Sequence, residues 1–175
     1  MQEKAKTVRL LALDVDGVLS DGTLYYGTAE AETKPFYTPD GLGIKLLQHA
    51  GIQVAIITGR QSDIVERRAA ELGIAHVVQR RDDKLVALNE LLEELDISLE
   101  QTAYMGDDLP DLSAIQAASL GMTVADGDAY VARHADWRSS APGGRGAVRE
   151  ACEMILEAQG KLDDARAAFH AGGSK

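Results

Sequence analysis

Residues 8–22 read VRLLALDVDGVLSDG, an apolar run that ends in two aspartates and a glycine, with a third aspartate shortly after them. Residues two apart in a strand face the same side, so Asp14 and Asp16 converge if the strand geometry continues through them. In an open parallel sheet, ligands bind beyond the carboxyl ends of the strands. The stretch therefore predicts a site at the end of the first strand of such a sheet.

The rest of the chain alternates short apolar runs with stretches of helical period. In order these are GIKLLQHAG, QVAIIT, SDIVERRAAELG, HVVQ, DDKLVALNELLEEL, TAYM, LSAIQAA, LGMTVA and AVREACEMILEAQ. Strands that alternate with amphipathic helices indicate βαβ units. We therefore predict an α/β fold, with a Rossmann-like, mainly parallel sheet and helices on both faces. At 175 residues, the chain is expected to form a single domain over 1–175.

Residues 23–41, TLYYGTAEAETKPFYTPDG, break this alternation and predict a small β-hairpin inserted after the first strand. Its four aromatic residues give more apolar surface than a lone hairpin can leave in water, so we expect it to contact a partner. Packing of the hairpin on its own domain stays open as the alternative. At the other end, the C-terminal tail 160–175 finishes in RAAFHAGGSK, which has the composition of a loose terminus.

The charge balance excludes some partners. The chain carries 18 Lys and Arg against 28 Asp and Glu, a net charge of −10, which argues against binding to nucleic acid or to an acidic membrane. No apolar run approaches membrane-spanning length, and Asp14 and Asp16 interrupt the N-terminal apolar stretch. We therefore expect a cytoplasmic location. The single cysteine, Cys152, lies in a helical pattern and is expected to be a buried apolar side chain.

Three other interpretations compete with a site at the DVDG stretch. An EF-hand loop beginning at Asp14 is excluded, because Val18, Leu19 and Tyr25 stand where calcium-binding loops need other residues. A dinucleotide site is disfavoured, since GLGIKL at 41–46 lacks the third glycine. A plain turn after a strand remains open, because Asp and Gly are common turn residues.

Polar residues recur at the ends of later predicted strands. QVAIIT ends in Thr58, followed by Gly59 and Arg60, and a hydroxyl with a run of backbone amides suits a phosphate. The competing interpretation of Thr58 is a helix N-cap. Lys84 begins a helical run straight after a strand, which places its ammonium near the same rim, although most lysines are solvated surface residues.

A cluster of carboxylates follows the predicted strand TAYM. The segment GDDLPD, 106–111, places Asp107, Asp108 and Asp111 at a strand end. Such residues are often helix caps or dipole partners. Three carboxylates beside another acidic pair would repel one another unless a cation held them, and hard, oxygen-rich sites suit Mg²⁺.

The order Asp-x-Asp-Gly, Thr, Lys and Gly-Asp-Asp-x-x-Asp resembles the haloacid dehalogenase superfamily of phosphotransferases. The resemblance implies that Asp14 is the nucleophile and Asp16 the general acid and base. It implies that phosphate is bound by Thr58, Gly59 and Lys84. It further implies that Mg²⁺ is held by Asp14, the backbone carbonyl of Asp16 and Asp107, with Asp108 or Asp111 orienting those ligands.

A closer resemblance covers nearly the whole chain. DVDGVLSDG, the hairpin in place of a cap domain, ITGR at 57–60 and GGRGAVRE at 143–150 resemble the 3-deoxy-D-manno-octulosonate 8-phosphate (KDO 8-phosphate) phosphatases. That family implies hydrolysis of a sugar phosphate in lipopolysaccharide inner-core biosynthesis. It also implies a homotetramer assembled by the hairpins, in which C-terminal segments close neighbouring active sites. Arg60 and Arg68 are the expected substrate-binding residues.

Two alternatives to this function remain open. One is a phosphatase of a nine-carbon nonulosonate phosphate, in which the residue after Thr-Gly tends to be acidic, so Arg60 favours the octulosonate. The other is a phospho-receiver domain, which also places acidic residues, Thr and Lys on a parallel sheet. Receivers have no aspartate two residues beyond the phosphorylated one, so Asp16 favours the enzyme.

Overall fold

The computed structural model describes residues 1–26 and 32–170, without the side chains of Tyr26 and His170. Its main sheet has six parallel strands in the order β5-β4-β1-β6-β7-β8. Their bounds are β1 Leu10–Leu13, β4 Gln53–Ile57, β5 His76–Val78, β6 Thr102–Met105, β7 Leu120–Thr123 and β8 Trp137–Arg138. The order reverses between β1 and β6, and sheets of this type bind ligands beyond the carboxyl ends of the strands at such a point.

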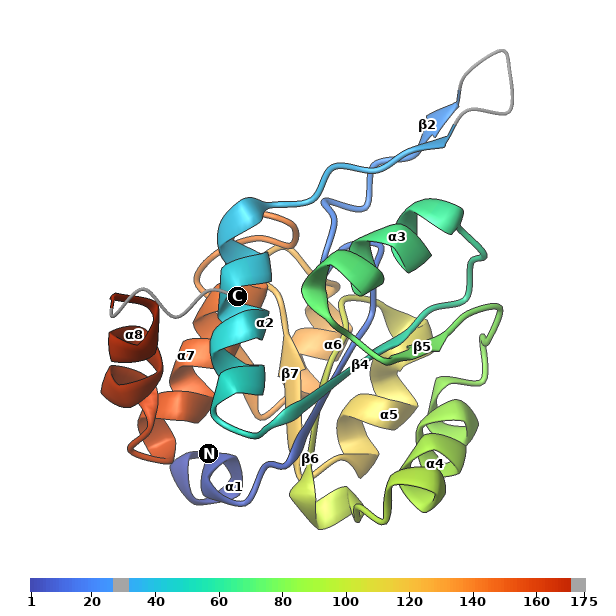
Figure 1. Cartoon of the computed structure of the whole chain (residues 1–175). Coiled ribbons are helices and arrows are strands. Elements are labelled where there is room, and N and C mark those ends of the chain that lie inside the picture. Colours follow the sequence, from blue (N-terminus) through green and yellow to red (C-terminus); the bar gives the residue numbers. More distant parts are fainter. Residues whose placement is uncertain (27–31, 171–175) are drawn as a thin grey trace.

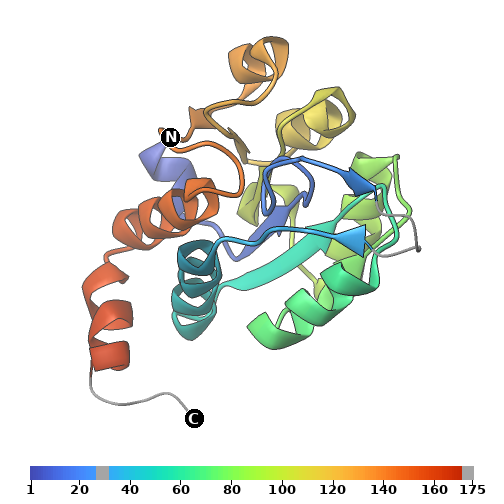
Figure 2. The same cartoon turned by 90° about the horizontal axis from the view of Figure 1, so that it is seen from above.

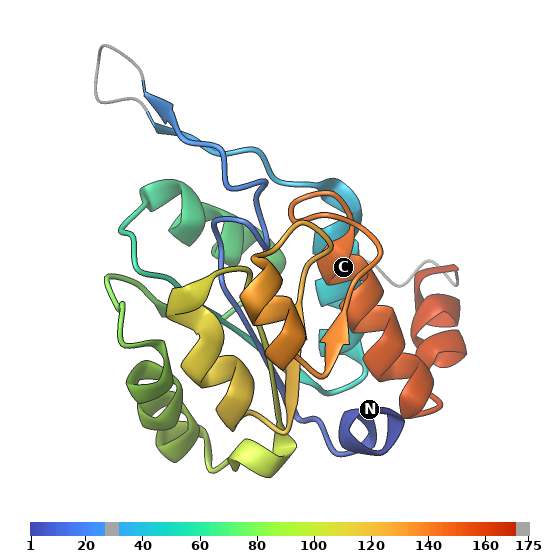
Figure 3. The same cartoon turned by 180° about the vertical axis from the view of Figure 1, so that it is seen from behind.

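Helices cover both faces of the sheet (Figures 1, 2 and 3). One face packs against α2 Thr38–His49, α3 Asp63–Leu72 and α7 Ala147–Ala158, with α1 Gln2–Lys6 and α8 Leu162–His170 beside them. The other face packs against α4 Lys84–Leu95, α5 Leu112–Ala117 and α6 Ala129–His134. Two short 3₁₀ turns, η1 Leu99–Gln101 and η2 Leu109–Asp111, flank β6. The predicted α/β fold with helices on both faces is confirmed.

Strand β1 shows why the opening apolar run does not alternate with polar residues. Leu11 and Leu13 pack into the core on one face, while Leu10 and Ala12 pack into the core on the other. All four residues are fully buried, as expected for a central parallel strand covered on both sides. The first polar side chain after this apolar run, Asp14, therefore lies where β1 leaves the sheet.

The predicted hairpin insertion is present and projects from the rest of the molecule (Figures 1 and 3). Strands β2 Tyr25–Tyr26 and β3 Glu32–Thr33 pair antiparallel. Residues 27–31 of the expected segment 23–41 lie outside the described residues. Its last four residues form the first turn of α2, because that helix begins at Thr38. Phe36 packs against the core rather than on the hairpin surface, whereas Tyr25 is 53% exposed.

The C-terminal tail is more ordered than its composition indicated. Helix α8 runs through residue 170, and Arg166 binds Glu153 of α7 with an N to O distance of 3.0 Å. Residues 171–175 lie outside the described residues. None of the helices in 1–26 and 32–170 has the length and apolar character needed to cross a membrane.

Candidate active site

A cavity of about 430 Å³ lies at the carboxyl ends of β1, β4 and β6. The residues that line it are Asp14, Asp16, Thr58, Gly59, Arg60, Asp82, Lys84, Asp107, Asp108, Pro110 and Asp111. The fold therefore brings together nearly all of the side chains that the motifs indicated. The plain-turn interpretation of DVDG is insufficient, because both of its aspartates face a cavity shared with three other motifs.

Asp14 is fixed in place by the sheet and by Lys84. Its backbone N–H donates to the carbonyl of Met105 at 3.0 Å, which extends the pairing of β1 and β6 by one residue. Its Oδ1 lies 2.8 Å from the Nζ of Lys84. Lys84 is only 3% exposed, so the surface interpretation of this lysine is wrong. Burial lowers the pKa of the ammonium, but the charges of Asp14 and Asp111 outweigh this effect and raise it.

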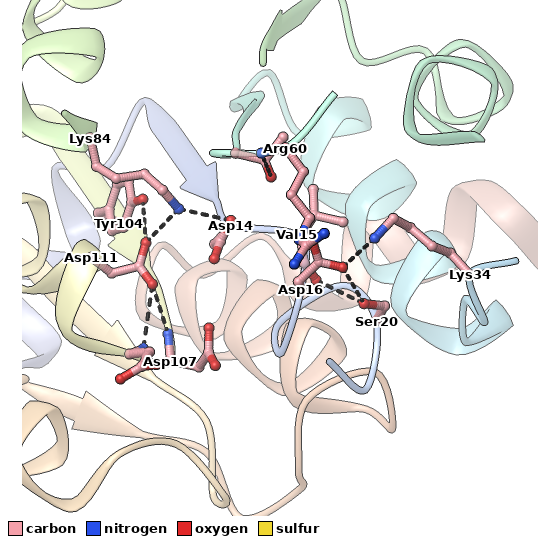
Figure 4. Close-up of polar contacts among 12 residues, drawn as sticks. Asp14, Val15, Asp16, Ser20, Lys34, Arg60, Lys84, Tyr104, Asp107 and Asp111 are labelled. Carbon is pink, nitrogen blue, oxygen red and sulfur yellow. Dashed lines mark hydrogen bonds and ion pairs between the residues drawn. The ribbon is translucent and has the colours of Figure 1, made fainter. Parts of the chain in front are cut away.

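Asp111 is the centre of a buried hydrogen-bond network (Figure 4). Its Oδ1 accepts from Lys84 at 2.9 Å and from the hydroxyl of Tyr104 at 2.8 Å. Its Oδ2 accepts from the backbone N–H groups of Asp107 at 3.2 Å and Asp108 at 3.4 Å. Both oxygens are thus engaged by the chain itself. Asp111 therefore holds the 106–111 loop and the lysine in one arrangement, and the Asp108 side chain caps η2 by accepting from Leu109 at 2.7 Å.

Tyr104 is a member of this network that the motifs did not reveal. It lies in the middle of β6 and is fully buried. Burial, reinforced by the charge of Asp111, raises the pKa of its hydroxyl well above the ordinary value. The only sequence signal was a tyrosine in the otherwise small and aliphatic run TAYM, since a buried phenol needs a hydrogen-bond partner.

The cavity concentrates negative charge. One carboxylate oxygen from each of Asp14, Asp107 and Asp111 lies within 4.8 Å of the others. Burial, together with the charges of Asp14 and Asp111, raises the pKa of Asp107 to about 7. Burial and the charge of Asp111 raise the pKa of Asp14 to about 6, although Lys84 acts in the opposite direction. Each of these carboxylates opposes the ionisation of its neighbours. A divalent cation such as Mg²⁺, which prefers hard oxygen ligands, fits such a cluster because its charge offsets the repulsion.

Two glycines allow the loops around the cavity to approach closely. Gly17, in the DVDG stretch, has a φ of +94°, and a Cβ at this position would lie 2.2 Å from Oδ2 of Asp107. A Cβ on Gly143 would lie 1.8 Å from the carbonyl oxygen of Gly17. The 143–150 segment thus packs directly against the loop that carries the two aspartates. The first glycine of the GGRGAVRE motif is therefore needed for this close contact.

Asp16 lies at the opposite side of the cavity from Lys84 (Figure 4). The ammonium of Lys34 binds its Oδ1, and Ser20 Oγ lies 3.5 Å from the same oxygen. Its Oδ2 lies 3.7 Å from the Nε of Arg60. The motifs did not indicate Lys34, because it lies in the segment between β3 and α2 and not at the end of a strand of the main sheet.

Thr58 and Gly59 follow β4 as expected. Thr58 is 2% exposed, and its hydroxyl oxygen accepts from the backbone N–H of Arg60 at 3.4 Å. The N-cap of α3 is Ser62, so the interpretation of Thr58 as the cap of that helix is wrong. Its hydroxyl is instead placed at the cavity wall beside the backbone amides of 59–60.

Arg68 is the expected site residue that this arrangement does not bring in. The described residues that line the cavity do not include it. It lies on α3, where its guanidinium carbon is 5.7 Å from the centre of the Phe36 ring and its Nη1 is 3.4 Å from Oε2 of Glu71. Within one chain, Arg68 therefore packs against Phe36, in the segment between β3 and α2.

Comparison with known proteins adds to this geometry. Residues 65–142 match the family model described as haloacid dehalogenase-like hydrolase. The chain is 49% identical over 163 residues to the 3-deoxy-D-manno-octulosonate 8-phosphate phosphatase KdsC of Escherichia coli (strain K12), across 93% of this chain and 87% of the relative.

Solved structures give the same result. A 3-deoxy-D-manno-octulosonate 8-phosphate phosphatase from Moraxella catarrhalis, crystallised with magnesium ion, phosphate ion and KDO, superposes with a TM-score of 0.94 at 50% identity, over 96% of this chain and 97% of the other. The phosphatase of the same description from Yersinia pestis gives a TM-score of 0.91 at 47% identity, over 93% and 88%. The similarity thus extends over nearly the whole chain.

Proposed function

Because this chain belongs to the haloacid dehalogenase-like hydrolases, in the family of the KDO 8-phosphate phosphatases, we propose that it hydrolyses KDO 8-phosphate to KDO and phosphate. The observation that carries the proposal is the buried pairing of Asp14 with Lys84, beside Asp107 and Asp111, in a cavity at the switch point of the sheet. This activity would place the protein in lipopolysaccharide inner-core biosynthesis.

Asp14 acts as the nucleophile in the proposed mechanism. A carboxylate and a phosphate dianion repel each other, so positive charge must offset the phosphate before the two can approach. Lys84 supplies one such charge at 2.8 Å from Asp14. A bond then forms between an oxygen of Asp14 and phosphorus, while the bond from phosphorus to the sugar oxygen breaks. The phosphoaspartate divides one difficult displacement into two easier ones.

Asp16 donates a proton in the first step and accepts one in the second. As the general acid it gives a proton to the departing sugar oxygen, which avoids release of an alkoxide. As the general base it then takes a proton from the water that attacks phosphorus. The second displacement releases phosphate and restores Asp14. The backbone amides of 59–60 and the hydroxyl of Thr58 bind the phosphate oxygens throughout.

The residues that would hold Mg²⁺ are Asp14, Asp107 and the backbone carbonyl of Asp16. The ion supplies positive charge that offsets the phosphate and the clustered carboxylates. Asp111 would act behind these ligands, because its two oxygens already accept from Lys84, Tyr104 and the backbone of 107–108. The Asp108 side chain would stabilise the same loop through its cap on η2.

Arg60 is the proposed contact for the substrate carboxylate. It lines the cavity, and its side chain remains 53% exposed. A guanidinium matches a carboxylate in shape and charge. The role proposed for Arg68 depends on assembly, since this side chain packs against Phe36 within its own chain.

We further propose a homotetramer in which hairpins form the contacts and C-terminal segments close neighbouring sites. The exposed Leu24 and Tyr25 on the projecting hairpin support this assembly. A cytoplasmic location is also proposed, because the apolar stretch that could pass for a leader forms the buried central strand β1.

A panel of sugar phosphates, assayed for phosphate release with and without Mg²⁺, tests the function. We expect KDO 8-phosphate to be hydrolysed with the highest kcat/KM, and only when Mg²⁺ is present. Preference for a nine-carbon nonulosonate 9-phosphate would support that branch instead. No release from any sugar phosphate, combined with stable labelling by acetyl phosphate, would support a phospho-receiver.

A further inference from the structure

Lys34 is a buried cation beside the substrate cavity. The mechanism proposed above gives it no role. Its side chain is 2% exposed, and its ammonium binds Oδ1 of Asp16 and lies 3.3 Å from Oε1 of Glu32. A buried ammonium is costly unless it is paired, and these two carboxylates provide the compensation. The two partners come from different places, since Asp16 follows β1 and Glu32 lies in β3.

The position of Lys34 indicates that it acts on Asp16 and not on the substrate. The described residues lining the 430 Å³ cavity include Asp16 but not Lys34. Figure 4 shows the lysine approaching Asp16 from the side away from Asp14, Lys84 and Asp111. The two oxygens of Asp16 are thereby distinguished: Oδ1 is engaged by Lys34 and Ser20, whereas Oδ2 is the oxygen nearest Arg60.

We propose, building on the phosphatase function above, that Lys34 is a positioning residue that binds Oδ1 of Asp16 so that Oδ2 exchanges the proton with the substrate. When Asp16 is protonated, Oδ1 is its carbonyl oxygen and accepts from the ammonium, while the proton sits on Oδ2. That proton moves to the sugar oxygen as its bond to phosphorus breaks. In the second step Oδ2 receives a proton from the attacking water. Lys34 keeps its own protons in both steps.

The test compares two substrates that differ in their need for a proton. The sugar oxygen of KDO 8-phosphate leaves as a poor leaving group, whereas p-nitrophenyl phosphate releases a phenolate that needs no general acid. The parameter kcat/KM covers the steps through departure of the leaving group. We expect Lys34→Met to lower kcat/KM about tenfold or more for KDO 8-phosphate, and less than about threefold for p-nitrophenyl phosphate. Equal losses on both substrates would overturn the proposal.

A comparison of Asp16→Asn with the double variant provides a second measurement if Asp16, left unpaired, prevents Lys34→Met from folding. Asp16→Asn removes that charge, so Asp16→Asn with Lys34→Met should fold. Because Lys34 acts only through Asp16, we expect this double variant to match Asp16→Asn in kcat/KM within about twofold. A further tenfold loss would overturn the proposal.

Lys45→Met is the matched control, since Lys45 is an exposed lysine on α2, and it should leave both substrates unaffected. Inactivity of the wild-type protein toward both substrates would overturn the phosphatase function itself. The Lys34 proposal is tested separately, because its variants are compared with a wild-type protein that is active.

Discussion

The Nζ of Lys84 lies 2.8 Å from Oδ1 of Asp14, and the lysine is 3% exposed. This ammonium also binds Asp111, so it is the counter-charge for two of the three clustered carboxylates. Its removal leaves these buried carboxylates without an opposite charge, which typically costs about 3–5 kcal/mol. We expect Lys84→Met to lower the free energy of unfolding by about this amount at pH 7.5 without Mg²⁺. Urea denaturation measures it, with Lys45→Met as control, and unchanged stability would show that the pair contributes nothing.

Asp14→Asn should abolish turnover while the protein still folds. The amide keeps the shape of the side chain but is not a nucleophile, so no phosphoaspartate can form. Phosphate release in the presence of Mg²⁺ is the measurement, and far-ultraviolet circular dichroism checks the fold. Residual activity within tenfold of the wild type would contradict the assignment of the nucleophile.

Stability without metal should fall as the pH rises through the range of the cavity carboxylates. The folded-state pKa values of Asp107, about 7, and of Asp14, about 6, both exceed the ordinary aspartate value of 3.8. A carboxyl with a raised folded pKa contributes stability that is fully present below its unfolded pKa and is lost as the pH passes the folded pKa. We therefore expect the free energy of unfolding in EDTA to decline between about pH 4 and pH 7.

Saturating Mg²⁺ should remove most of this decline, because a bound cation favours the ionised carboxylates. Asp107→Asn should likewise flatten the profile in EDTA, since it removes the group with the higher pKa of the two. Urea denaturation across this pH range measures both effects. The same slope in EDTA and in Mg²⁺ would argue against a cation at these residues.

Arg60→Ala should separate the two kinds of substrate. A charge-assisted hydrogen bond to the substrate carboxylate is worth about 1.5–3 kcal/mol, so we expect about a tenfold to hundredfold loss in kcat/KM for KDO 8-phosphate. p-Nitrophenyl phosphate has no carboxylate and should be affected little. If both substrates lost equally, Arg60 would serve the phosphate or the fold, and the preference for an octulosonate would lose its support.

The hairpin prediction concerns assembly. Leu24 and Tyr25 are 38% and 53% exposed on the projecting hairpin, so Leu24→Asp with Tyr25→Asp should disrupt a hairpin-mediated tetramer by burying charge at the contact. Sedimentation velocity measures the change in mass. Leu109→Asp, at a residue 58% exposed on η2, is the control outside the hairpin. A wild type that sediments as a fully active monomer would refute the tetramer.

Sequence periodicity and motif order were sufficient for the fold and for most of the site. Runs such as VRLLAL and QVAIIT identify strands buried on both faces, and the residue after each run lies at the carboxyl edge of the sheet. Parallel strands end at a common edge, so Asp14, Thr58 and Asp107 were expected along that edge, and the neighbouring order β4-β1-β6 brings them together. Placement at the edge depends on local pattern, which is why it could be predicted.

The contacts around those residues were decided by tertiary structure. Lys34 meets Asp16 because the hairpin arm returns across the loop after β1. Asp40, which lies within the predicted hairpin insertion 23–41, is buried and accepts from the backbone N–H groups of Gly146 at 3.2 Å and Arg149 at 2.8 Å, at the start of α7.

Within one chain, Arg68 packs against Phe36 and is not among the residues that line the cavity. Each of these pairings joins segments whose relative path is set by loop trajectories and core packing. No periodicity encodes such paths, because a side chain's partner across the fold depends on the positions of all the elements between them. The sequence thus determined which groups gather at the edge of the sheet, and the tertiary structure decided which charges lie behind them.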